Sequence, residues 1–378
     1  MRILIIAPDY PPLAGGIGKL IFELKRSLED DELRVLAPAS PEAHQEASVL
    51  RLSFCHSAPW VRKFFQSFVW LGHALCFAFP KRTTVVFGCL FPLGWLGPVL
   101  RAVTRSPYLV VCHGSEVPAP VHPAWRRVMG KWILEKSAAV VTYSAYTENR
   151  TKILAPRAKI RLITVGVDAG FFKPLPKDPS LVHQWGLEGK KVLLGVGRQV
   201  RRKGFDTALQ AFAAVHRRRS DVRLLFAGDG PERPRLVRLA EDLGVAEETL
   251  FAGEVAGERL LGYYALADVV LFLSREEGTD VEGFGLVALE AAACAKAVIG
   301  GRSGGVPEAV LDGKTGLIVD PQDVDGVRRA IETLLEQDSV RGELEQNARR
   351  HALARSWVAC GRQSREALER IERNPGVC

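Results

Sequence analysis

Long hydrophobic runs are absent from this sequence. The longest apolar stretch, residues 64–79, is broken by polar and glycine residues and is too short and too polar to span a bilayer. The apolar segment 3–7 ends at Pro8 and Asp9, far short of the core of a secretory signal peptide. We therefore expect a cytoplasmic protein without a membrane-spanning segment.

Paired cysteines are missing as well. The 7 cysteines of the 378-residue chain are scattered, odd in number and never spaced as CxxC, which argues against a disulfide framework or a zinc site. The sequence has no Cys/His finger, no RNP-like aromatic motif and no regularly spaced basic helix, so nucleic acid is not an expected partner.

The composition that remains is typical of a globular protein with more than one domain. The length predicts two or three domains, and the 47% hydrophobic and 25% charged content is ordinary. Residues 1–176 carry 22 Lys and Arg against 12 Asp and Glu, a net charge of +10, whereas residues 177–378 carry 29 against 31, a net charge of −2. The basic half predicts an anionic partner such as a membrane surface or a lipid phosphate.

Strand-like apolar runs alternate with helical patterns in both halves, which predicts an α/β fold with parallel sheets covered by helices on both faces. Ligands of such sheets bind beyond the carboxyl ends of the strands. Strands are expected at 2–7, 33–37, 84–87, 108–112, 139–142 and 160–164, and again at 191–197, 222–227, 250–252, 269–274, 297–299 and 316–319. Helices are expected at 18–28, 205–218, 233–243, 258–267, 284–295 and 327–335.

The segment 279–292, TDVEGFGLVALEAA, is the most informative part of the chain. Glu282 and Glu290 are separated by seven residues, and Gly283 and Gly285 follow the first glutamate. The glycines mark a tight loop, so Glu282 is expected in the loop and Glu290 roughly two turns into the next helix. Helix amides attract phosphate and carboxylates accept hydrogen bonds from hydroxyls, a combination that suits a sugar nucleotide.

This pattern resembles the acidic signature of the retaining glycosyltransferases of family 4. In that family the first glutamate contacts the donor sugar and the second the nucleotide ribose, roles that the resemblance assigns to Glu282 and Glu290. Gly283, Phe284 and Gly285 then belong to the donor-binding loop. The glutamate spacing alone also fits an ordinary amphipathic helix, and the flanking residues favour the family.

The resemblance also implies a fold and its domain limits. The family has the glycosyltransferase B fold, in which two Rossmann-like domains with parallel sheets face each other across a cleft. Residues 1–170, joined by a C-terminal helix at about 355–378, would be the acceptor-binding domain. Residues 171–354 would bind the nucleotide sugar, and residues 167–189 have the composition of a linker.

Basic residues follow the strand that opens the second half. Arginine grips two phosphate oxygens at once and lysine adds a point charge. The resemblance assigns Arg198 and Lys203 to the donor diphosphate, which they would stabilise as the leaving group. Arg201 and Arg202 lie between them and are interpreted as a solvated basic loop.

The segment 111–116, VCHGSE, ends an apolar strand in the basic half. It is similar to the HGxE loop of the family, whose histidine contacts the donor sugar. His113 is therefore a candidate for sugar positioning and charge stabilisation. Glu116 either orients His113 or caps the next segment. An isolated histidine at such a place is otherwise an ordinary core or loop residue.

The glycine loop 11–18, PPLAGGIG, precedes a helix, so Gly15 and Gly16 are candidates for donor binding through exposed amides. A structural turn is an equal alternative. A nicotinamide or flavin fingerprint is disfavoured because the spacing is GGxG, and because no acidic residue follows the second strand. By resemblance, Val255 lies beside the nucleotide base.

No metal or other cofactor is expected. Asp323-Val-Asp325 has the Asp-x-Asp form that other glycosyltransferases use for a divalent ion, but it opens an expected helix and is explained by helix capping. With Arg198, Lys203 and helix amides near the diphosphate, a metal is unnecessary.

The predicted function is retaining transfer of a hexose to a lipid-linked or glycan acceptor in cell-envelope or exopolysaccharide synthesis. GDP-mannose is the first expectation for the donor and a UDP-hexose the second. A sugar-nucleotide epimerase, a phosphorylase and a non-catalytic sugar-nucleotide-binding protein remain alternatives, although no pyridoxal-binding lysine signature is present.

Residues 58–79, rich in aromatics with Arg62 and Lys63 near their start, fit two alternatives. One is peripheral contact with an anionic membrane at the inner face of the plasma membrane, and the other is a buried helix that covers the first sheet.

Overall fold

The computed structural model describes residues 1–11, 16–28, 32–40, 46–53, 60–79, 82–119, 122–255 and 257–373, with the side chains of 60–65 left undescribed. The chain divides into two compact units. Unit 1 comprises Met1–Val165 and Trp357–Cys378, and unit 2 comprises Gly166–Ser356. The corresponding limits expected from the sequence are residues 170 and about 355.

Unit 1 is built on a seven-stranded parallel sheet with the order β3-β2-β1-β4-β5-β6-β7. The order reverses between β1 and β4, which are hydrogen-bonded neighbours. Parallel sheets place their ligands at such a reversal, beyond the carboxyl ends of the strands. The strands are β1 Arg2–Ile6, β2 Glu32–Pro38, β3 Val49–Leu52, β4 Thr84–Phe87, β5 Tyr108–Cys112, β6 Ala139–Thr142 and β7 Ile160–Leu162.

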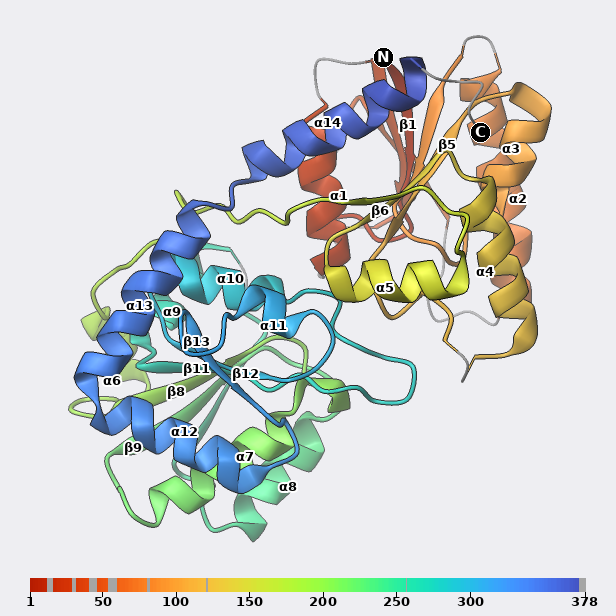
Figure 1. The fold of residues 1–378 in the computed structure, drawn as a ribbon. Helices are drawn as coiled ribbons and strands as arrows, with labels where there is room; N and C mark the ends of the chain where they lie inside the picture. Colours follow the sequence, from red (N-terminus) through yellow and green to blue (C-terminus); the bar gives the residue numbers. More distant parts are fainter. Residues whose placement is uncertain are drawn as a thin grey trace. The chain divides into compact units, whose positions relative to one another are not determined.

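Helices cover both faces of this sheet (Figure 1). One face buries Val85 and Phe87 against α2, α3 and α4, and the alternate residue Val86 lies toward α1 and α14 on the other. Helix α14 returns from the far end of the sequence to α1, where Arg365 donates to the Ser27 carbonyl at 3.1 Å. The helices are α1 Gly16–Arg26, α2 Trp60–Ala78, α3 Leu96–Thr104, α4 Ala124–Lys136, α5 Ala145–Leu154 and α14 Trp357–Arg373.

Helix α2 has one buried and one exposed face. Ser67, Trp70 and Ala74 recur at helical spacing and are buried, whereas Phe68 and Val69 are 47% and 54% exposed. The alternative of a helix that covers the first sheet is confirmed, but its expected burial all round is wrong, because Phe68 and Val69 are exposed. Within the described ranges, no helix has the length and apolar content that crossing a bilayer requires.

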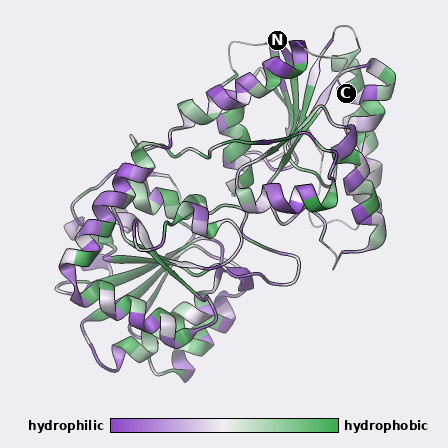
Figure 2. Ribbon diagram, viewed as in Figure 1, coloured by the Kyte–Doolittle hydropathy of each residue, from purple (hydrophilic) through white to green (hydrophobic). Residues whose placement is uncertain are grey.

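Unit 2 is built on a six-stranded parallel sheet with the order β10-β9-β8-β11-β12-β13. Its order reverses between the neighbours β8 and β11. Both sheets are made of hydrophobic strands, as Figure 2 shows. The strands are β8 Lys191–Val196, β9 Val222–Ala227, β10 Thr249–Gly253, β11 Val269–Phe272, β12 Val298–Gly301 and β13 Gly316–Val319.

The helices of unit 2 also form two layers. The core on one face joins the sheet to α7, α8 and α12, and α9, α10 and α11 lie on the other face (Figure 1). Asp323 caps α12 by accepting from the Gly326 amide at 2.9 Å, which confirms the capping role expected for the Asp-x-Asp segment. The helices are α6 Pro179–Gln184, the 3₁₀ turn η1 Arg201–Lys203, α7 Phe205–His216, α8 Arg233–Asp242, α9 Glu258–Leu266, α10 Leu286–Ala293, α11 Val306–Ala309, α12 Val324–Glu336 and α13 Asp338–Leu353.

Candidate functional site

The candidate residues of unit 2 follow the two strands at its order reversal. The chain leaves β8 at Val196 and reaches Arg198 and Lys203, and it leaves β11 at Phe272 and reaches Glu282. Because β8 and β11 are neighbours, their carboxyl ends share one edge of the sheet. Residues about 80 positions apart in the sequence are thereby brought into contact.

Glu282 is held by three donors. Lys203 Nζ and Arg202 Nη1 each lie 2.5 Å from Glu282 Oε2, and Ser274 Oγ donates to the same oxygen at 3.3 Å. The side chains of Lys203 and Glu282 are 10% and 14% exposed, so the pair is largely removed from water. Lys203 Nζ also lies 4.8 Å from the ring centroid of Phe272, a cation–π distance.

The electrostatics of this cluster fix its charges at neutral pH. Burial alone would raise the pKa of Glu282, but the charges of Lys203 and Arg202 outweigh it and lower that pKa to about 2. Burial lowers the pKa of Lys203, an effect that Glu282 opposes. At neutral pH Glu282 is therefore a carboxylate that can only accept hydrogen bonds.

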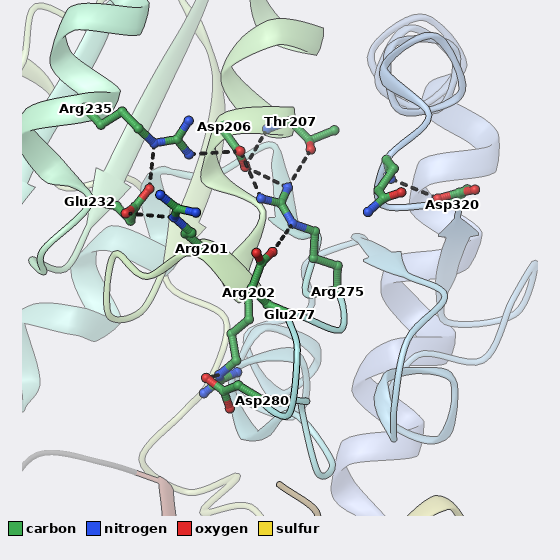
Figure 3. A network of polar contacts seen from close by, with 11 residues as sticks. Arg201, Arg202, Asp206, Thr207, Glu232, Arg235, Arg275, Glu277, Asp280 and Asp320 are labelled. Atoms are coloured by element: carbon green, nitrogen blue, oxygen red, sulfur yellow. Dashed lines mark hydrogen bonds and ion pairs between the residues drawn. The ribbon is translucent and has the colours of Figure 1, made fainter. Parts of the chain in front are cut away.

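Arg202 differs from its sequence-based interpretation. Its Nε lies 2.9 Å from Asp280 while its Nη1 contacts Glu282, and its side chain is 22% exposed. It is therefore a part of the cluster, and its interpretation as a solvated loop residue is wrong. Figure 3 shows Arg202 pointing to Asp280, whereas Arg201 points toward Glu232. Arg201, with a side chain 64% exposed, fits the solvated interpretation.

The different directions of the Arg201 and Arg202 side chains follow from the local backbone. Arg201, Arg202 and Lys203 form the 3₁₀ turn η1, in which successive side chains are about 120° apart. Gly204 ends the turn with φ +66°, and a Cβ there would lie 2.1 Å from the Leu273 carbonyl oxygen. The turn thus sits directly on the end of β11, and Lys203 and Arg202 are aimed at the loop that follows it.

Arg198 is not part of the described contacts around Glu282. It comes two residues after β8, directly after Gly197, and its side chain is exposed. Within the described ranges, no hydrogen bond or ion pair involves its guanidinium group. Lys203 and Glu282 are thus brought together, and Arg198 shares their edge of the sheet without joining their contact.

The acidic loop is shaped by close backbone contacts. Gly285 has φ +103° and directly precedes α10, and a Cβ there would lie 2.6 Å from the Phe272 ring. The neighbouring turn at Gly304 and Gly305 packs on this loop so closely that a Cβ on Gly304 would lie 2.1 Å from the Glu282 carbonyl oxygen. Gly283 lies in the loop after Glu282, as the sequence predicted, and Phe284 lies there as well, although the expected helix included it.

Glu290 lies on α10, but nearer its start than expected. The helix begins at Leu286 rather than 284 because Gly285 adopts a left-handed backbone conformation, so Glu290 lies just over one turn in. Its residue is 7% exposed, and Tyr264 Oη donates to its Oε2 at 3.1 Å. Burial raises the pKa of Tyr264 well above its usual value, and the Glu290 charge adds to that shift.

Val255 follows β10 and is half-buried. The loops after β8, β9 and β10 pack closely against one another near Val255. A Cβ on Gly228 would lie 2.1 Å from the Gly197 carbonyl oxygen, and the Gly228 amide donates to the Gly253 carbonyl at 2.7 Å. Gln199, fully buried, donates through its side chain to the Gly228 carbonyl at 2.8 Å.

The candidates of unit 1 follow β5, beside the order reversal of that sheet. His113 directly follows β5, and its Nε2 lies 2.7 Å from the carbonyl oxygen of Gly88, the residue after β4. Because that oxygen only accepts, Nε2 carries a proton, while Nδ1 is buried without a hydrogen-bond partner among the described residues. Glu116 Oε1 accepts from the His113 backbone amide at 2.5 Å, so Glu116 orders the loop rather than contacting the imidazole.

Gly16 is the first residue of α1 and is exposed. The neighbouring candidate Gly15 lies outside the described residues. Across the described ranges, no three His, Cys, Asp or Glu side chains are grouped so that they could hold a metal ion.

Comparisons with known proteins agree over both halves. Residues 14–171 match the family described as Glycosyltransferase Family 4, and residues 180–351 match Glycosyl transferases group 1. The chain is 34% identical, over 94% of each chain, to a GDP-mannose-dependent alpha-(1-6)-phosphatidylinositol monomannoside mannosyltransferase of Mycolicibacterium smegmatis. A GDP-mannose-dependent monoacylated alpha-(1-6)-phosphatidylinositol monomannoside mannosyltransferase of Corynebacterium glutamicum is 30% identical over 97% of this chain and 98% of its own.

Solved structures share the fold. Sucrose-phosphate synthase from Thermosynechococcus elongatus matches with a TM-score of 0.85 and 23% identity, over 99% of this chain and 100% of its own. HepE from Anabaena, solved in complex with UDP-glucose, matches with a TM-score of 0.81 and 19% identity, over 98% and 100%.

Proposed function

Because this chain belongs to glycosyltransferase family 4, we propose that it transfers mannose from GDP-mannose to a lipid-linked acceptor of the phosphatidylinositol mannoside class. The chain is a hexosyltransferase with the glycosyltransferase B fold. The observation that carries the donor and acceptor is the 34% identity, over 94% of each chain, to a mannosyltransferase named for both.

The cations after β8 suit the chemistry of a leaving diphosphate. The bond between the anomeric carbon and the diphosphate oxygen breaks, and negative charge grows on GDP. Lys203, which is already buried beside a carboxylate, and the exposed Arg198 neutralise that charge more strongly in the transition state than in the ground state. Both residues therefore act on the leaving group.

The acceptor completes the exchange. Its hydroxyl oxygen forms the new bond to the anomeric carbon on the face that the diphosphate leaves, and its proton passes to a phosphate oxygen of GDP. The anomeric configuration is retained, and no side-chain nucleophile is required. GDP-mannose is an alpha-linked donor, so an alpha-linked product of the kind named for the relatives is consistent with this retention.

The acidic residues bind the rest of the donor. Glu282, ionised at neutral pH, accepts hydrogen bonds from hydroxyls of the sugar, and Gly283, Phe284 and Gly285 supply amides near the start of α10. Glu290, fixed by Tyr264, accepts from the ribose hydroxyls. Val255 contacts the base.

Unit 1 contributes His113 and the glycine loop. His113, held at the end of β5 by the contact of its Nε2 with the Gly88 carbonyl, is assigned to the donor sugar. Glu116 keeps the His113 loop in place through the backbone amide, and Gly15 and Gly16 line the donor phosphate.

The reaction proceeds without a divalent metal, because Arg198 and Lys203 provide the positive charge that a metal would otherwise bring. Transfer is expected to persist in excess EDTA, and an absolute requirement for Mg²⁺ or Mn²⁺ would contradict this part of the proposal. The protein would meet its lipid acceptor as a peripheral protein at the inner face of the plasma membrane.

The donor and acceptor are tested together by product analysis. The purified chain is incubated with detergent-dispersed phosphatidylinositol monomannoside and with GDP-mannose, UDP-glucose or UDP-galactose in parallel. We expect one added hexose from GDP-mannose only, with an alpha anomeric signal by NMR. Preferred use of a UDP-hexose would overturn the donor assignment. Failure to release mannose from GDP-mannose, with or without acceptor, would favour a non-catalytic binding protein.

A further inference from the structure

Helix α4 of unit 1 presents an apolar row to the surface. Trp125, Val128 and Trp132 are 59%, 70% and 44% exposed. At about 100° per residue these three side chains fall within an arc of about 60°. Exposed single hydrophobic residues are ordinary, but two tryptophans and a valine in one row mark an interaction surface.

The opposite face anchors the helix in the unit 1 core. Ile133 and Leu134 are fully buried and belong to the cluster that covers one face of the sheet. Gly130 is buried too, and a Cβ there would lie 3.2 Å from the Pro118 ring. The helix therefore cannot rotate to bury Trp125 and Trp132, and these side chains are fixed outward.

Cations flank the apolar row. Arg127 and Lys131 are exposed and lie together on one side of it, and the side chain of Lys131 is 53% exposed with only a 4.0 Å contact to Glu135. The surrounding segment, residues 1–176, carries a net charge of +10. The surface defined by Trp125, Arg127, Val128, Lys131 and Trp132, called the α4 face below, is thus both apolar and positively charged.

We propose that the α4 face docks on an anionic lipid bilayer. Tryptophan favours the boundary between headgroups and acyl chains, and basic side chains beside it pair with lipid phosphates. A protein partner would be expected to cover the tryptophans with a complementary hydrophobic surface. The two cations instead favour the phosphate-rich surface of a lipid bilayer. The inference rests on the proposed lipid acceptor, since docking would bring unit 1 to the plane in which that acceptor lies.

The inference moves the membrane contact from the segment expected by sequence to another helix. Helix α2 also exposes Phe68 and Val69, and its basic residues Arg62 and Lys63 have undescribed side chains, whereas on α4 both the apolar and the basic side chains are seen at the surface. Helices α2 and α4 both contact α3, so α2 is the nearest alternative for the lipid contact. A variant of α2 therefore belongs in the test.

Vesicle flotation of the full chain tests the proposal. Vesicles of phosphatidylcholine alone are compared with vesicles that contain about 30% phosphatidylinositol, each at low and at high salt. The variants are Trp125→Ser with Trp132→Ser, Arg127→Gln with Lys131→Gln, and Phe68→Ser. Val358→Ser is the matched control, because Val358 is 78% exposed on α14 of the same unit.

We expect the wild type to float with anionic vesicles and the tryptophan pair variant to bind at least about tenfold more weakly, since interfacial binding scales with buried apolar area. Each cation removed should weaken binding about fivefold at low salt. Val358→Ser should match the wild type. A wild type that does not float overturns the proposal, as does a tryptophan variant that floats as well as Val358→Ser. A Phe68→Ser loss larger than that of the tryptophan pair would place the contact on α2 and also overturn it.

Mannosyl transfer separates the two proposals. With a short-chain, water-soluble acceptor the tryptophan variant should keep wild-type turnover, and with acceptor in vesicles it should lose activity in proportion to binding. If the wild type transfers mannose but does not float, only the docking proposal fails. If it floats but transfers nothing, the proposed function fails.

Discussion

Replacement of Arg202 by glutamine tests whether the cluster around Glu282 works as a unit. Arg202 Nη1 lies 2.5 Å from Glu282 and its Nε lies 2.9 Å from Asp280. Removing its charge leaves Lys203 as the one remaining cation on Glu282 among the contacts that the structure describes. Lys203 would then be held more tightly by Glu282 and be less available to the diphosphate.

The magnitude follows from the lost contact. A hydrogen bond to a charged group is worth about 1.5–3 kcal/mol, and about 1.4 kcal/mol corresponds to a tenfold change in rate. Because Lys203 and Ser274 still hold Glu282, we expect the lower part of that range. Arg202→Gln should reduce kcat/KM for GDP-mannose by about tenfold to thirtyfold. Arg202 acts here as a positioning residue.

The neighbouring arginine provides the matched control. Arg201 is the same residue type, precedes Arg202 directly and pairs with Glu232 at 3.5 Å with a side chain 64% exposed. Arg201→Gln should change kcat/KM by less than about twofold, as befits an exposed ion pair. Steady-state mannosyl transfer and thermal unfolding of both variants are the measurements. Equal kcat/KM in the two variants, with both folded, would refute the reasoning.

Three further predictions concern the same site. Glu282→Gln should lower the free energy of unfolding at pH 7 by about 3 kcal/mol, the scale of a pKa lowered from 4.5 to about 2. This loss of stability should vanish as pH falls from about 5 to about 2. A loss that does not depend on pH would contradict the prediction. Gly304→Ala should cost stability and donor affinity because its Cβ meets the Glu282 carbonyl, whereas Gly278→Ala, with a similar φ of +60° and open space, should cost only the backbone strain; equal melting temperatures and KM values would count against this. Tyr264→Phe should raise the KM for GDP-mannose about fivefold by removing the hydroxyl that donates to Glu290, and an unchanged KM would argue against a ribose role for Glu290.

The sign of the Glu282 effect follows from its lowered pKa. The folded protein holds the carboxylate ionised to lower pH than the unfolded chain does. The stabilisation is therefore fully present above the unfolded pKa of about 4.5 and is lost as pH falls through about 2. Unfolding by urea at several pH values, for the wild type and Glu282→Gln together, measures it directly.

Buried strands could be predicted closely from the sequence. The strands at 84–87, 108–112 and 139–142 have the expected bounds because each is a short run of mostly apolar residues that are all buried. Strand β3, Val49–Leu52, was not predicted, since it is a short edge strand of residues that are mostly half-buried and contain an arginine. The start of α10 was misplaced because Gly285 adopts a left-handed conformation, with φ +103°, that its sequence position does not reveal.

The polar cluster was only partly predictable. Glycine spacing and the basic pair pointed to Glu282 and Lys203, which the structure joins. Arg201 and Arg202 are indistinguishable by composition, and only the 3₁₀ turn separates their directions. The signal that could have singled out Arg202 is the presence of two acids, Asp280 and Glu282, in the opposing loop.

Helix α4 was not predicted, although its pattern is visible in the sequence. Trp125, Val128 and Trp132 recur at helical spacing, but without a structure they fit a buried face as well as an exposed one. Their exposure is set by Ile133 and Leu134, which pack on the sheet and leave the tryptophans outward.

The central claim is that cations after β8 stabilise the diphosphate as it leaves the sugar. The direct test is kcat for mannosyl transfer at saturating GDP-mannose by Lys203→Ala and Arg198→Ala, with folding checked by circular dichroism. The account predicts a loss of at least about tenfold to a hundredfold in each variant. Turnover within about twofold of the wild type in both folded variants would contradict it.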